Sequence, residues 1–72
     1  MIDDNVFVRY IGLPRTIMAV TIPNRDGTFD VYVNEVIPEE LQRAALSHEM
    51  KHIRLGHFYD YNHVYINELE AG

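Results

Sequence analysis

The chain contains no cysteine among its 72 residues. Without cysteine it can form no disulfide, offer no thiolate to zinc and provide no thiol nucleophile. This composition is typical of proteins in the reducing cytoplasm, which is the location we expect. Any metal site in such a chain has to be built from histidine and carboxylate side chains.

Positive charge and long apolar runs are also scarce. Six basic residues stand against eleven acidic ones, which gives a formal net charge of −5. Because an acidic chain is poorly suited to neutralising phosphates, we expect no nucleic-acid partner. The longest apolar stretch is far shorter than a membrane-spanning helix, and the start, Met-Ile-Asp-Asp, lacks the basic and apolar regions of a signal peptide. We therefore expect no membrane partner.

The length and an apolar content of 47% indicate one globular domain over residues 1–72. Its order of signals predicts an α+β fold, a small antiparallel sheet followed by two helices on one face. Strands are expected at residues 6–10, 16–22 and 28–34, and helices at residues 38–56 and 61–71. Turn-forming residues 23–27 should join the second and third strands as a hairpin. In the third strand, the alternation places Phe29, Val31 and Val33 on one face and the polar residues on the other.

The first predicted helix contains the sequence His48-Glu49-Met50-Lys51-His52, an H-E-x-x-H motif. Residues four apart lie on one face of a helix, so the two imidazoles can converge on one metal ion. Glu49 is offset by about 100° and can instead contact a metal-bound water. Polar residues at helical spacing mark the opposite side as the solvent-facing one, which predicts that this triad points towards the interior.

A structural explanation of the motif competes with the catalytic one. Two buried histidines can hydrogen-bond to backbone groups, and Glu49 can pair with an arginine. A metal would satisfy both histidines at once, and it would also help to stabilise so small a domain. Asn34 and Asp30 are candidates to orient the imidazoles.

A zinc site of this type needs a third protein ligand and an open fourth position for water. The candidates are His57, His63 and an acidic residue near the end of the chain. If residues 61–71 are helical, Glu68 falls on the same face as Tyr61, Val64 and Tyr65, and a carboxylate on an inward face needs a partner. This favours Glu68, whereas His57 falls at the helix end and His63 on the polar side.

The segment from His48 to His57, with its extended H-E-x-x-H…G-H pattern, resembles the ImmA/IrrE-type metallopeptidases, a bacterial and phage group of zincins. The strand ending at Asn34, the helix opening at Pro38 and the sequence Glu68-Leu69-Glu70-Ala71 are also similar to that family. The resemblance covers roughly residues 16–71 and implies a zincin-like fold. Gly72 stands where the family has Asn or Asp, and the sequence stops before the family's further helix, so we expect a domain shortened at this end.

The resemblance implies a zinc-dependent peptidase that acts on a protein or peptide, such as a phage or mobile-element repressor. It assigns His48, His52 and Glu68 as Zn²⁺ ligands and Glu49 as the general base. Tyr59, Tyr61, His63 and Tyr65 are candidates to stabilise the oxyanion, with no pattern to choose among them. A binding or regulatory module with the zincin fold but no catalysis, and a purely structural domain, are the alternatives. The oligomeric state does not follow from the sequence.

Overall fold

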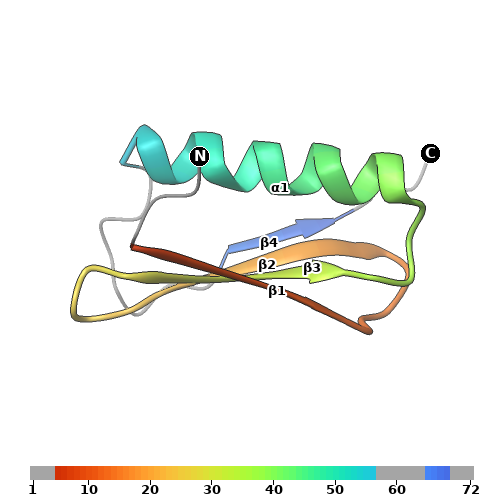
Figure 1. The fold of residues 1–72 in the computed structure, drawn as a ribbon, viewed down its shortest axis with the longest axis horizontal. Coiled ribbons are helices and arrows are strands. Elements are labelled where there is room, and N and C mark those ends of the chain that lie inside the picture. The colour runs from red at the N-terminus through yellow and green to blue at the C-terminus, as the bar shows by residue number, and fades with distance from the viewer. Residues whose placement is uncertain (1–4, 57–64, 69–72) are drawn as a thin grey trace.

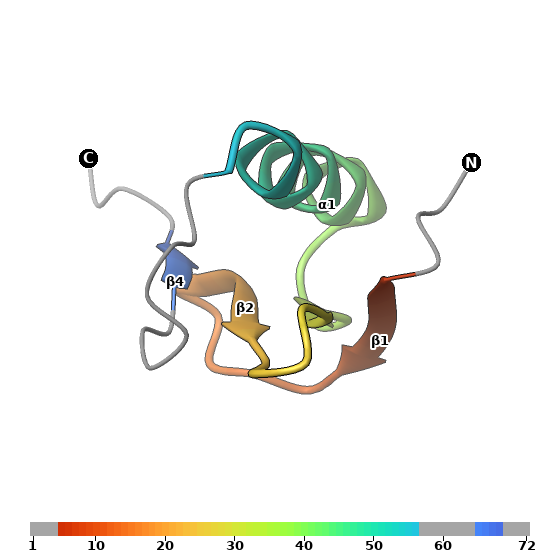
Figure 2. The ribbon, with the colours of Figure 1, turned by 90° about the vertical axis from the view of Figure 1, so that its left-hand side faces the viewer.

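The computed structural model describes residues 5–56 and 65–68. The elements follow in the order β1 (Val6–Ile11), β2 (Ile17–Pro23), β3 (Phe29–Asn34), α1 (Glu39–Arg54) and β4 (Tyr65–Glu68). Figures 1 and 2 show two layers, a twisted sheet and one helix that lies across one of its faces. The α+β class is therefore confirmed, with a four-stranded sheet and a single helix in the described residues.

The β2–β3 hairpin forms where the turn signals predict it. The two strands pair antiparallel, with Ala19 opposite Val33 and Pro23 opposite Phe29. In the turn, the Asn24 N–H donates to the Thr28 carbonyl over 2.8 Å. Gly27 has a φ of 89°, a left-handed conformation that glycine adopts without steric cost.

The expectation of a purely antiparallel sheet is wrong. The strand order is β1-β3-β2-β4, and β1 pairs with β3 in parallel, from Val6 opposite Phe29 to Ile11 opposite Asn34. The cause is the segment 12–16, which carries the chain past the end of β3. β1 and β2 run in opposite directions on the two sides of β3, and because β2 pairs antiparallel with β3, β1 and β3 point the same way.

Asn34 holds this crossing segment in place, and its side chain is fully buried. Its Oδ1 accepts from the backbone N–H groups of Leu13 and Val36, both over 3.0 Å. Its Nδ2 donates to the carbonyls of Pro14 (3.0 Å) and Ile17 (2.9 Å). The amide thus uses its full hydrogen-bonding capacity, which removes the cost of burying it.

The core lies between the sheet and α1. Val31 and Val33 of β3 are fully buried with Val6 of β1, and Phe29 packs against them while half-buried. Phe29, Val31 and Val33 therefore share one face of β3, as the alternation predicts, and that face is the one against the core. Leu46, Met50 and Ile53 pack on the same cluster from α1, so one flank of the helix covers β1 and β3.

Helix α1 begins and ends within two residues of the prediction. Pro38 precedes its first turn, and Glu39 and Glu40 place negative charge at the helix N-terminus, where it is favourable. Leu55 caps the other end, followed by Gly56 with a φ of 71°. Across residues 5–56 and 65–68, no helix has the length and apolar character needed to cross a membrane.

The predicted second helix is wrong at residues 65–68, which form strand β4 on the edge of β2. Residues 61–64 and 69–71 of that prediction lie outside the described residues. Val20 pairs with Ile66 and Thr21 with Tyr65, with an irregularity between Ile17 and Ala19. The open edge of β2 offers backbone hydrogen-bonding groups to this segment, and this tertiary gain outweighs a weak helical periodicity.

Candidate metal centre

His48 and His52 of α1 bring their side chains together, as their i, i+4 spacing predicts. The two Nε2 atoms are 3.1 Å apart, a hydrogen bond in which a protonated Nε2 donates to an unprotonated one, and the rings meet edge to face with centroids 4.5 Å apart. Two nitrogens bound tetrahedrally to one zinc at 2.0–2.1 Å lie roughly 3.3 Å from each other. The imidazole pair therefore already has nearly the spacing that two ligands of one zinc ion require.

The prediction that all three motif side chains point inward is wrong for His48, which is exposed, while His52 is half-buried. Only Glu49 is fully enclosed, with 0% of its surface exposed. The reason is that α1 packs against the sheet on one side only. Glu49 lies about 100° around the helix from His48, so when Glu49 points at the sheet His48 lies on a flank of the helix.

Glu49 contacts strand β2, where the Thr21 hydroxyl donates a hydrogen bond to Glu49 Oε1. Thr21 is itself fully buried. At Oε2, no donor among the described residues reaches hydrogen-bonding geometry. Burial raises the Glu49 pKa to about 7, and hydrogen bonding by Thr21 and by the nearby Asn67 amide opposes this rise only in part. The carboxylate is thus poised to exchange a proton near neutral pH.

Thr21 and Asn67 were not singled out from the sequence. Thr21 is the polar exception among Met18, Ala19, Val20 and Ile22 of β2, and its neighbours Ala19 and Pro23 along the inward face are buried. A polar residue on this apolar face is the feature of the sequence that indicates a buried polar contact at Thr21. Asn67 could not be placed, because its segment read as a helix and its position opposite Ala19 follows from strand pairing.

No third His, Asp or Glu among the described residues lies close enough to His48 and His52 to complete a metal site. Glu68 is exposed at the end of β4, opposite Ile17, and the helical argument that placed it on an inward face does not hold. Residues 5–56 and 65–68 contain no group of three His, Asp or Glu side chains close enough to hold a metal ion. His57, His63, Tyr59 and Tyr61 lie outside the described residues, and the Glu68 assignment stays a prediction.

The two residues expected to orient the imidazoles have other partners. Asn34 secures the segment between β1 and β2, as described above. Asp30 accepts from Arg9 over 3.0 Å and from Asn24 over 3.1 Å. In both cases the hydrogen bonds go to strand or loop groups rather than to the helix.

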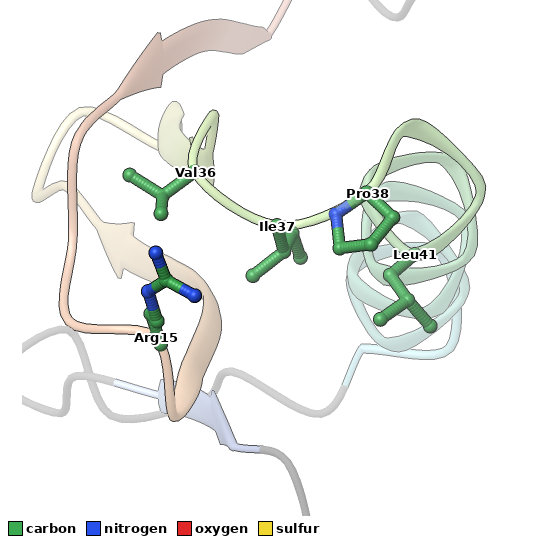
Figure 3. A pocket seen from close by; sticks show the side chains of 5 residues that line it. All are labelled: Arg15, Val36, Ile37, Pro38 and Leu41. Atoms are coloured by element: carbon green, nitrogen blue, oxygen red, sulfur yellow. The ribbon is translucent and has the colours of Figure 1, made fainter.

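A cavity of about 210 Å³ lies at the N-terminal end of α1, lined by Arg15, Val36, Ile37, Pro38 and Leu41 (Figure 3). Its walls are apolar apart from the Arg15 guanidinium, which projects from the segment before β2. Leu41 precedes His48 by two helical turns, a rise of about 10 Å. The cavity is therefore separate from the histidine pair.

Comparison with protein-family models, curated proteins and solved structures gives no match for this chain. The function has to be argued from the geometry of His48, Glu49 and His52.

Proposed function

We propose that the protein is a zinc-dependent peptidase in which His48 and His52 bind the metal and Glu49 acts as the general base. One observation carries the proposal. The two imidazole nitrogens, four residues apart on α1, lie 3.1 Å from each other, nearly the spacing of two ligands of one zinc ion, with the buried Glu49 carboxylate next to His48 in the motif. Two histidines and carboxylates are a donor set that suits zinc.

Zinc bound at the pair would polarise a substrate carbonyl and lower the pKa of its bound water. Glu49 is held by Thr21 through Oε1, which leaves Oε2 as the oxygen that takes a proton and later returns it to the leaving amine. Burial raises the Glu49 pKa in the metal-free chain, and a zinc ion bound beside it would favour the ionised carboxylate that accepts the proton. Glu68 is the third ligand that the family resemblance assigns, with His57 and His63 as the alternatives.

The substrate in this proposal is a peptide or protein. By the same resemblance, a phage or mobile-element repressor is the substrate class to test first. Glu49→Gln is the variant that separates metal binding from catalysis, because it keeps the size and the Oε1 acceptor of the side chain. We expect it to bind zinc as the wild type does and to lose at least about 100-fold in peptide hydrolysis, the scale of general-base catalysis.

A second function is favoured by the complete burial of Glu49 and its hydrogen bond to Thr21. In this alternative the chain is a binding or regulatory module with a zincin-like fold, and the Glu49 carboxyl serves only to join α1 to the sheet. Such a protein binds its partner without cutting it.

Metal content is the first experiment, measured by mass spectrometry on protein purified without a His tag and offered zinc. We expect about one zinc per wild-type chain, loss of zinc in His48→Ala, and full retention in Ser47→Ala, a control at the neighbouring exposed position. No zinc in the wild type would rule out the peptidase. Zinc with hydrolysis that Glu49→Gln leaves unchanged would remove Glu49 from the mechanism, and zinc without any hydrolysis would favour the binding module.

A further inference from the structure

Strand β1 forms one edge of the sheet, and no described strand pairs with its outer side. The carbonyls of Asn5 and Ile11 accept from Phe29 and Glu35, so odd-numbered residues of β1 direct their backbone groups at β3. In a strand these directions alternate. The N–H and C=O groups of Val6, Val8 and Tyr10 therefore point away from the sheet, at the free edge.

The side chains of β1 are mostly apolar, as in strands that have a neighbour on both sides. Phe7 is 46% exposed and Ile11, on the same face of the strand, is 37% exposed, while Tyr10 on the opposite face is 51% exposed. The one charged residue of β1 is Arg9, which pairs with Asp30 over 3.0 Å and lies over the Tyr32 ring at 5.9 Å. Natural edge strands are usually protected by charge, proline or a bulge, and β1 has only this neutralised arginine.

We propose that β1 pairs antiparallel with β1 of a second copy of the chain, across a two-fold axis at Val8, to make a continuous sheet through both molecules. In this register Val8 faces Val8 of the second copy, and each Val6 faces a Tyr10. The three residues whose backbone groups point at the free edge then form hydrogen-bonded pairs, and each pair exchanges two backbone hydrogen bonds.

The pattern of side chains selects a second copy in this register. Phe7 comes opposite Arg9 of the other molecule, where its ring can pack on the aliphatic stem of that side chain while the guanidinium stays with Asp30 and Tyr32. A two-fold axis one residue further along, at Arg9, would place the two arginines face to face and leave Val6 without a pair inside the strand. The chain has a net charge of −5, but β1 contains no acidic residue, so pairing two β1 strands places no carboxylates of the two strands opposite each other.

Strand pairing of this size gives a modest interface, so we expect a dissociation constant in the micromolar range. Sedimentation velocity over a range of concentrations measures it. Tyr10→Pro removes one outward N–H from each copy and leaves the bonds to β3 intact, because proline is tolerated on an edge strand. We expect it to weaken the dimer at least about tenfold more than Tyr10→Ala, which loses the ring but keeps the N–H.

The register is tested by cross-linking, which is unambiguous because the chain has no native cysteine. Val8→Cys places two thiols on the axis, at a Cα separation of about 5.5 Å that a disulfide can span. Tyr10→Cys is the control, because its two copies lie about 13 Å apart along the strands. We expect a disulfide dimer for Val8→Cys alone.

Several results would overturn the proposal. They are a wild type that stays monomeric at several hundred micromolar, a dimer equally stable in Tyr10→Pro and Tyr10→Ala, or failure of Val8→Cys to cross-link. Far-ultraviolet circular dichroism of each variant shows whether it has kept the fold, and concentration-dependent protection of the Val8 and Tyr10 amides from hydrogen exchange tests the same pairing in the wild type. None of these measurements depends on zinc or on peptidase activity.

Discussion

At the scale of single residues, the decisive feature is a carboxylic acid that is buried with no cationic partner among residues 5–56 and 65–68. Glu49 has 0% of its surface exposed, accepts a hydrogen bond from Thr21, and burial raises its pKa to about 7. Burial favours the neutral form of a carboxyl because a charge loses its hydration in the interior. The same property that suits Glu49 to proton transfer therefore makes its ionised form costly to the fold.

This cost predicts a pH dependence of stability. Because the Glu49 pKa rises from 4.5 to about 7 on folding, the folded chain binds more protons between these values than the unfolded chain. The contribution of Glu49 is fully present below about pH 4.5 and is lost as the pH rises through about 7. Each pKa unit corresponds to about 1.4 kcal/mol, so the contribution approaches roughly 3 kcal/mol.

Urea unfolding of the metal-free protein between pH 4.5 and 8 measures this effect, with Glu49→Gln as the reference. We expect the stability of the wild type, relative to that of Glu49→Gln, to fall over this range. The histidines titrate in both proteins, so the difference isolates Glu49. A difference that stays constant with pH would mean that Glu49 is not desolvated in the fold.

At the scale of elements, the end of α1 depends on one glycine. Leu55 and Gly56 donate to carbonyls of the last helical turn, and Gly56 does so with a φ of 71°. This left-handed conformation costs a residue with a Cβ about 1 kcal/mol or more. The end of the helix matters to the site because His52 lies in its last turn.

We expect Gly56→Ala to lower the free energy of unfolding by about 1 kcal/mol, a value that thermal or urea denaturation can measure. Gly12→Ala is the matched control, because Gly12 has no positive φ and an added Cβ would meet its nearest neighbours at 3.9 Å. Equal effects of the two substitutions would show that the conformation of Gly56 does not limit the helix end.

At the scale of the whole molecule, a small core has to support a two-layer fold. Six hydrophobic residues of the described chain are buried, namely Val6, Ala19, Val31, Val33, Ile37 and Ala45. A domain of this size is marginal on its own, so a metal bound by α1 would add a large share of its stability. Binding of a ligand only to the folded state stabilises it in proportion to the logarithm of the ligand concentration.

We therefore expect zinc at about 100 times its dissociation constant to stabilise the wild type by about 2.7 kcal/mol, which raises Tm by roughly 10 °C or more in a domain this small. A chelator should reverse the shift. Scanning calorimetry of wild type, His48→Ala and Ser47→Ala tests this, with the shift absent in the first variant and retained in the second. An equal shift in His48→Ala would place the zinc elsewhere.

The sequence by itself determined the features that depend on neighbours along the chain. The hairpin, the shared face of Val31 and Val33, the bounds of α1 within two residues and the convergence of His48 and His52 all follow from local periodicity and turn chemistry. The tertiary structure alone decided the parallel pairing of β1 with β3, the recruitment of residues 65–68 as a strand and the choice of Thr21 as the hydrogen-bond partner of Glu49. These depend on which edges and faces meet in space, and a backbone edge that needs hydrogen-bond partners takes them from segments that local pattern assigns otherwise.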